Sequence, residues 1–154
     1  MIRYWLMKTE PEVFSIEDLR REKTSPWEGI RNYQARNYLR DHVQKDDQVF
    51  IYHSNAKPTG IAGTAVVVKT AYADHTALDP KAPYYFPKAT PENNPWVMVD
   101  VRYETRCREI ITRDQLRETR GLENMVVLKN GRLSIQPVSP QEFKIITEKF
   151  SFYK

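Results

Sequence analysis

The segment from Trp27 to Arg40, WEGIRNYQARNYLR, combines the side chains that nucleotide-binding sites use. It holds an indole, two tyrosines, three arginines and several amides, and no carboxylate lies between Gly29 and Arg40. Arginines and amides cover apolar surface poorly, so a purely structural helix has little use for this mixture. An indole can stack on a base, amides can bind a base edge, and arginines can hold phosphates. The segment therefore predicts a nucleotide site.

A second polar stretch, His53 to Lys57, follows an apolar run and adds hydrogen-bonding groups. The candidates for the edge of a base are Asn32, Gln34, Ser54 and Asn55. The candidates for phosphates are Arg31, Arg36, Arg40 and Lys57.

Structural roles compete with these assignments. Trp27 could belong to the core, Asn32 could cap a helix, and Ser54-Asn55 could be an ordinary turn. The arginines could form only a solvated helix face, and we expect Tyr38 to be a core residue. The polar residues Arg132, Ser134 and Gln136 favour a structural network that supports the site.

No catalytic constellation accompanies these residues, and we expect neither metal nor cofactor. The three histidines lack metal-binding spacing, and Cys107 has no evident histidine partner. His53 and Ser54 are neighbours in an expected strand, where consecutive side chains point to opposite faces, so they are a poor base and nucleophile pair. Asp100 interrupts an apolar run; a buried hydrogen-bonding role is favoured over a role as general base.

The composition is that of an ordinary globular protein with a mild preference for polyanions. The chain has 154 residues, 40% hydrophobic and 29% charged, with a formal net charge of +4. This length suits one domain covering residues 1–154. A single cysteine excludes an internal disulfide and fits a reducing compartment, the cytoplasm or a eukaryotic nucleus. We expect no signal peptide and no membrane span.

Hydrophobic patterning predicts short elements in irregular alternation. Strands are expected at 3–8, 48–53, 60–71, 96–106 and 132–138, and helices at 15–22, 33–43, 112–118 and 139–150. Capping residues mark several helix starts, the clearest being Ser139-Pro140-Gln141-Glu142. The apolar stretch 122–128 is ambiguous. The pattern predicts an α/β (α+β) protein with a curved mixed β-sheet, or a small β-barrel, flanked by short helices.

Residues 72–95 form a long connection that contains five prolines and the aromatic run Tyr84-Tyr85-Phe86. A connection of this length is usually functional or disordered, and adjacent aromatics argue against disorder. We expect an ordered flap.

Several stretches, in chain order, resemble the EVE domain family. They are YWLMKTEPEVFSIEDL, WEGIRNYQARNYLR, FIYHSN, GIAGTAVVVKTAY, TALDPKAPYY, NPWVMVDV and RLSIQPVSPQEF, and together they span nearly the whole chain. The family belongs to the PUA-like superfamily and is similar to YTH domains, which read a methylated adenine in RNA. The resemblance implies a PUA-like fold and a reader of modified bases, with 5-methylcytosine-type DNA marks as one class.

The resemblance also implies a base pocket. Trp27-Glu28-Gly29 lies where YTH domains have the tryptophan wall of their cage, and Ser54-Asn55 resembles their Ser-x-Asn loop. For a second aromatic wall the chain offers Tyr84, Tyr85, Phe86 and Trp96, and Tyr33 is a further candidate. Many EVE sequences read Tyr-Tyr-Asp-Pro where this chain has Tyr85-Phe86-Pro87, which leaves the base preference open.

The predicted function is therefore non-catalytic binding of a modified base in DNA or RNA. One rival is an enzyme that uses the same pocket with Asp100 as general base. Another rival is a protein-interaction adaptor that docks through residues 72–95. Neither the choice of modification nor the oligomeric state follows from the sequence.

Overall fold

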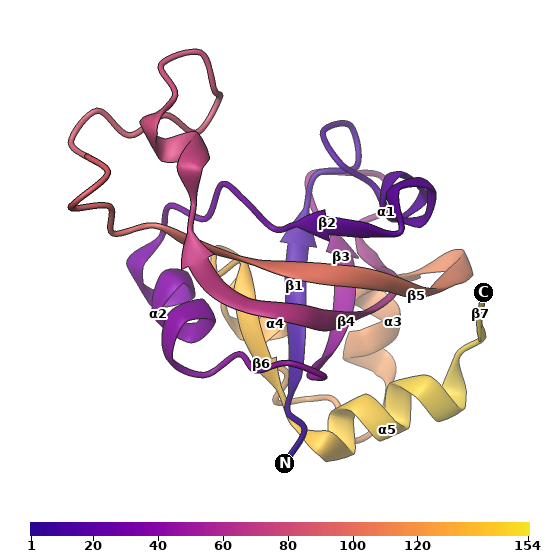
Figure 1. Ribbon diagram of the computed structural model, residues 1–154. Helices are drawn as coiled ribbons and strands as arrows, with labels where there is room; N and C mark the ends of the chain where they lie inside the picture. Colours follow the sequence, from indigo (N-terminus) through magenta and orange to yellow (C-terminus); the bar gives the residue numbers. More distant parts are fainter.

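Seven strands form one open, mixed sheet in the computed structural model, which describes residues 1–154 (Figure 1). The strands are β1 (Tyr4–Thr9), β2 (Thr24–Pro26), β3 (Gln48–His53), β4 (Gly60–Ala73), β5 (Val97–Thr112), β6 (Ile135–Val138) and β7 (Phe152–Tyr153). Their order is β2-β5-β4-β3-β1-β6, and β7 pairs with β5. Only β1 and β3 run parallel. The expected mixed sheet is confirmed, and it stays open instead of closing into a barrel.

Short helices follow the capping signals. They are α1 (Ile16–Glu22), α2 (Tyr33–Asp41), the 3-10 helix η1 (His75–Leu78), α3 (Arg113–Glu118), α4 (Val126–Lys129) and α5 (Pro140–Lys149). Reciprocal capping boxes begin α1, α3 and α5, with Ser15, Thr112 and Ser139 as caps. Helix α2 ends two residues earlier than expected because the N–H groups of both His42 and Val43 bind the Tyr38 carbonyl.

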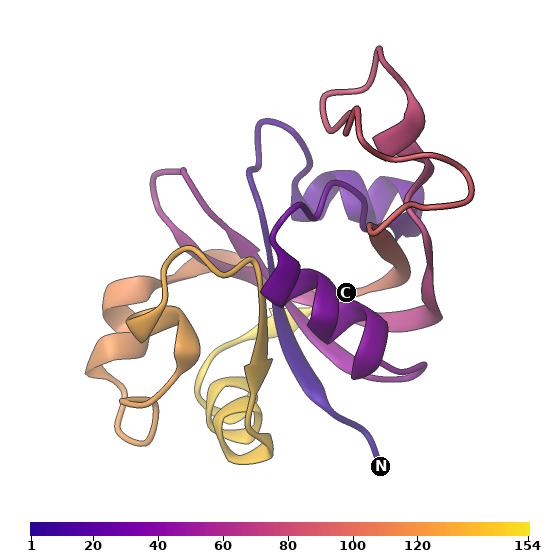
Figure 2. The ribbon, with the colours of Figure 1, turned by 90° about the vertical axis from the view of Figure 1, so that its left-hand side faces the viewer.

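The sheet buries both faces because side chains alternate along the central strands. Trp5, Met7 and Ile51 pack in one core with α1 and α2. Leu6 and Phe50 pack in a second core with α3, α4 and α5. Figure 2 shows the purple α2 on one side of β1 and the orange and yellow helices on the other.

Residues 74–96 fold into an extension beyond the sheet (Figure 1). The Asp74 N–H donates to the Trp96 carbonyl at 3.0 Å, which closes the base of the extension. Within it, the Phe86 N–H donates to the Ala77 carbonyl at 2.8 Å. The extension is thus ordered by its own hydrogen bonds, as expected.

The structure departs from the expected elements at the end of β5. This strand continues to Thr112 because its second half pairs with the start of β4 and with β7. Cys107 therefore lies inside the strand, where burial raises the pKa of its thiol to about 12. The short elements β7 and α4 carried no clear sequence signal. No helix has the length and apolar character needed to cross a membrane.

Candidate functional site

A cavity of about 560 Å³ lies where five separate segments meet. The β1–α1 connection contributes Phe14, the chain after β2 contributes Trp27, and the β3–β4 turn contributes Ser54. The extension between β4 and β5 contributes Tyr84, and the α4–β6 connection contributes Arg132. The volume lies within the range of small-molecule sites. The fold thus brings the first residues of the Trp27–Arg40 stretch and Ser54-Asn55 of the second stretch to one cavity.

Trp27 belongs to the core and also forms a wall of this cavity. The residue is 5% exposed, and its ring meets Phe14 edge-on with 6.0 Å between ring centroids. The backbone N–H of Trp27 donates to the Val99 carbonyl at 2.7 Å, which attaches this segment to β5. The cavity runs from this indole to Ser54 and Asn55. The two roles considered for Trp27 are therefore compatible, and packing in the core holds the indole in place.

Gly29 allows the second aromatic wall to approach. Its φ is +85°, and a Cβ at this position would lie 2.6 Å from the Tyr84 ring. Its N–H donates to Oδ2 of Asp74 at 2.9 Å. Any side chain at Gly29 would therefore strain the backbone and displace Tyr84.

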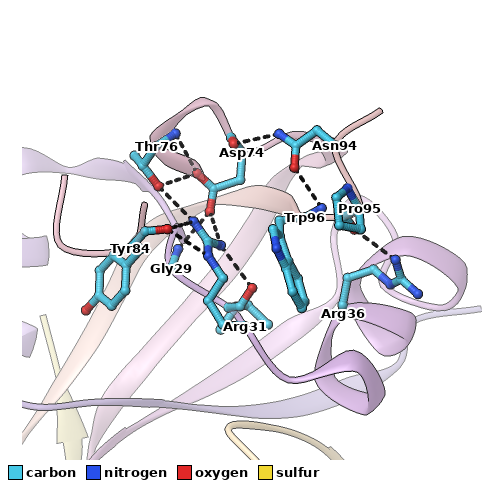
Figure 3. A network of polar contacts seen from close by, with 10 residues as sticks. Gly29, Arg31, Arg36, Asp74, Thr76, Tyr84, Asn94, Pro95 and Trp96 are labelled. Carbon is cyan, nitrogen blue, oxygen red and sulfur yellow. Dashed lines mark hydrogen bonds and ion pairs between the residues drawn. The ribbon is translucent and has the colours of Figure 1, made fainter. Parts of the chain in front are cut away.

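Arg31 fastens the extension to the segment that carries Trp27 (Figure 3). Its guanidinium donates to the carbonyls of Tyr84 and Ile30, to the Asp74 carboxylate and to the Thr76 hydroxyl, in five hydrogen bonds. A guanidinium has five N–H donors, so none remains for a phosphate. The expected phosphate-binding role of Arg31 does not fit this geometry, and we assign the residue a positioning role.

Asp74 is the fully buried partner of Arg31, with an Nη1–Oδ2 distance of 2.9 Å. It also accepts hydrogen bonds from the N–H of Thr76 and of Gly29. Burial by itself would raise the pKa of Asp74, but the hydrogen bonds from Thr76, Gly29 and Arg31 outweigh it and hold the pKa below its ordinary value. The carboxylate is thus ionised, and its hydrogen bonds and ion pair are all made within the protein.

The other aromatic candidates gather around Trp96, outside the cavity. Trp96 is 1% exposed, with the Tyr33 ring centroid at 4.7 Å and the Phe86 centroid at 5.3 Å. The Arg31 guanidinium lies near both Tyr84 and Trp96, at 5.9 and 5.5 Å from the ring centroids. Tyr33, Phe86, Trp96 and the exposed Tyr85 do not line the cavity. From the aromatic run, only Tyr84 does.

The candidates on α2 also point elsewhere. Asn32 caps the helix, because its Oδ1 accepts the Ala35 N–H at 2.9 Å. Gln34 is exposed and lies outside the cavity. Arg36 donates to the Pro95 carbonyl at 2.9 Å, as Figure 3 shows, and Arg40 pairs with its neighbour Asp41. The helix supports the extension and does not contact the cavity.

Ser54 and Asn55 form a turn at the mouth of the cavity. The Ser54 N–H donates to the Thr9 carbonyl at 2.9 Å, which joins the turn to β1. Asn55 has a φ of +50°, a left-handed conformation that asparagine tolerates better than most residues. The side-chain amide of Asn55 makes no hydrogen bond within the protein, so it remains available to a ligand. Lys57 is exposed two residues further on and borders a second cavity.

His53 links two elements, β3 and α1, whose neighbouring residues line the cavity. Its Nε2 accepts the Ile16 N–H at 3.1 Å, which joins the end of β3 to the start of α1. Burial lowers the pKa of His53, so the ring is neutral at pH 7. The histidine is thus a structural acceptor.

The structure does not bring the proposed enzymatic groups into the cavity. Asp100 accepts a hydrogen bond from the Tyr72 hydroxyl and lines neither cavity. No three His, Cys, Asp or Glu side chains lie together in a metal-binding group.

Sequence reasoning missed several lining residues, including Lys8, Glu10 and Phe14. Arg132 and Ser134 line the cavity, whereas Gln136 is buried and supports their turn by donating to the Asn130 and Leu133 carbonyls. Lys8 donates to the Gly131 carbonyl at 2.6 Å, and burial together with nearby Arg113 lowers the pKa of its ammonium. Lys8 is the last residue of the expected first strand and Phe14 lies between that strand and the expected first helix, so neither carried a signal for the cavity.

Comparison with known proteins identifies the family. The EVE domain model matches residues 3–149. Human thymocyte nuclear protein 1 is 41% identical over 162 residues, which cover 93% of this chain and 72% of the relative.

Solved structures agree with this match. A hypothetical protein from Leishmania major superposes with a TM-score of 0.94 at 49% identity, covering 96% of this chain and 94% of the other. Human THYN1 in complex with 5-methylcytosine-containing DNA superposes with a TM-score of 0.88 at 40% identity, covering 97% and 99%. An ASCH protein from Zymomonas mobilis, at 12% identity and a TM-score of 0.55, shares the fold alone. The chain belongs to the EVE domain family.

Proposed function

We propose that this protein binds DNA carrying a modified base and holds that base, turned out of its stack, in the cavity beside Trp27. The observation that carries the proposal is the position of Trp27, which is anchored in the core yet lines a cavity shared with Ser54 and Asn55. The complex of human THYN1 with 5-methylcytosine-containing DNA supports the choice of ligand.

The cavity offers what an unstacked base needs. Such a base exposes two π faces and a polar edge, and stacking on an aromatic side chain contributes about 1–3 kcal/mol. Trp27 and Tyr84 supply aromatic surface. Asn55, Ser54 and Glu28 supply groups for the edge, and a carboxylate suits the amino group of cytosine. The chemistry fits a cytosine-type ring.

A methyl mark by itself offers little discrimination. Burying one carbon contributes about 0.8 kcal/mol, which is a few-fold preference. Stronger selectivity needs a hydrogen bond or a shape that rejects the unmodified base. Trp27 is anchored in the core and Gly29 has no room for a side chain, and these constraints favour selection of the base by shape.

The test compares binding of 5-methylcytosine DNA and its unmodified twin by wild type and Trp27→Leu. We expect the variant to lose the preference, because stacking on the indole is lost, while residual affinity from phosphates remains. Trp5→Phe is the matched control: Trp5 lies in the same core but outside the cavity, and its variant should keep the preference. An unchanged preference in a folded Trp27→Leu protein would overturn the proposal.

The proposed role is binding without catalysis. Asp100, the candidate general base, lies outside the cavity and is bonded to Tyr72. Mass spectrometry of the oligonucleotide after prolonged incubation should show no change in its bases. Turnover that Asp100→Asn abolishes would instead support the enzymatic alternative.

A further inference from the structure

A second cavity, of about 610 Å³, adjoins the first at the β3–β4 turn. Both cavities are lined by Lys8, Ser54, Asn55 and Gly131. The second is also lined by further residues of the turn, by Arg113 at the start of α3, and by Glu12, Tyr52 and Val127. Figure 2 shows this turn standing above the orange α3 and α4. The Ser54-Asn55 turn therefore separates two neighbouring compartments.

The two compartments differ in charge. The first contains more acidic than basic side chains, namely Glu10, Glu22 and Glu28 against Lys8 and Arg132. The second contains Lys8, Lys57 and Arg113 against Glu12. An anionic phosphate is thus disfavoured in the first compartment and favoured in the second.

Two of the three cations that line the second cavity are also available, whereas Lys8 donates to the Gly131 carbonyl. Lys57 makes no ion pair or side-chain hydrogen bond within the protein, and Arg113 donates only to the Leu128 carbonyl, at 3.3 Å. Arg31 and Arg40, by contrast, are each paired with a carboxylate. Unpaired cations facing a cavity can neutralise a ligand anion without first breaking an internal contact.

We propose that the second cavity binds the phosphodiester next to the flipped base, with Lys57 and Arg113 as its contacts. This inference rests on the proposed function of the first cavity. The nucleotide is then divided at the Ser54-Asn55 turn, with the base on the acidic side and the backbone on the basic side. Phosphate binding is thereby assigned to the β3–β4 turn and α3, and not to the arginines of α2.

The experiment measures binding of single-stranded DNA with a central 5-methylcytosine, and of its unmodified twin, at several salt concentrations. Lys57→Gln and Arg113→Gln should each weaken binding to both strands and reduce the slope of log affinity against log salt by about 0.7. The preference for the methylated strand should stay unchanged. Lys45→Gln and Arg120→Gln are exposed controls that remove one charge outside both cavities and should leave the slope at its wild-type value.

A neutral backbone provides the second arm. Methylphosphonate linkages on both sides of the 5-methylcytosine should weaken wild-type binding, because they remove the charges that Lys57 and Arg113 contact. The same methylphosphonate linkages should weaken binding by the Lys57→Gln/Arg113→Gln double variant only slightly. Two changes that remove the same contact are not additive.

The outcomes separate the two proposals. A preserved methyl preference with wild-type salt slopes in both variants would overturn the phosphate site and leave the base pocket standing. Equal slope losses in the Lys45 and Arg120 controls would overturn it as well, because the effect would then be one of overall charge. A wild-type protein without any methyl preference would overturn the proposed function itself.

Discussion

At the scale of single residues, the shape of the cavity depends on positions where one additional atom would change it. Gly29 is the clearest, because the Tyr84 ring occupies the space that a Cβ would need. Asn55 also lines the cavity, and its side-chain amide makes no hydrogen bond within the protein. Such residues are small or polar and contribute little to the core, so their importance lies in the shape of the site.

Gly29→Ala should lower both stability and selective binding. The new Cβ would displace Tyr84 and strain a backbone with positive φ, at a cost of about 1–3 kcal/mol. Urea denaturation measures the first effect, and binding to 5-methylcytosine DNA measures the second. Gly131→Ala is the stability control, because its Cβ would meet no atom within 4 Å. Equal stability of Gly29→Ala and wild type would contradict the assigned role.

At the scale of elements, the cavity is held by links between segments that are distant in sequence. His53 joins β3 to α1, and Ser54 joins the following turn to β1. These links place the turn opposite Trp27. The site should therefore be sensitive to groups that never touch a ligand.

Stability should fall as the pH drops below about 6.5, because His53 must stay neutral to accept the Ile16 N–H. Its folded pKa is lowered by burial, so the unfolded state binds more protons in this range, and stability decreases until the folded pKa is passed. Chemical denaturation between pH 7.5 and about pH 5 measures this decrease. His53→Gln should abolish it, whereas His75→Gln, an exposed control, should retain it. The same decrease in both variants would contradict this account.

At the scale of the whole molecule, two cores share one sheet, and a folded extension is attached to it. The extension contributes Tyr84 to the cavity through the contacts of Arg31 and Asp74. Loss of either charge would leave the other without its partner in a largely buried position. The ion pair should thus contribute to global stability as well as to the site.

Asp74→Asn should destabilise the protein by about 3 kcal/mol at pH 7. The folded pKa of Asp74 is depressed, so its contribution is complete above the unfolded value of 3.8 and is lost as the pH falls through the folded pKa. The difference in unfolding free energy between wild type and variant should therefore shrink below about pH 4. Asp79→Asn, in the same extension but exposed and without an ion pair, should behave like wild type throughout. A pH-independent difference for Asp74→Asn would contradict the ionised pair.

The sequence by itself determined the elements whose signals are local. The Ser139-Pro140-Gln141-Glu142 start of α5 and the apolar run of β3 were predictable, because capping and alternation act between near neighbours. Trp27 and Ser54-Asn55 were also candidates from the sequence, and the structure places them around one cavity. The end of β5 could not be predicted, because charged residues interrupt the apolar pattern there. The strand continues through pairing with β4 and β7.

Only the tertiary structure decided which of the candidate residues share a cavity. Arg31 looked like a phosphate ligand until the fold placed Asp74, 43 residues away, against its guanidinium. Tyr84, and not Tyr85 or Phe86, faces the cavity because Gly29 leaves room for its ring. Side-chain types state what a residue can bind, but long-range contacts decide which donors remain free, and those contacts exist only once the chain has folded.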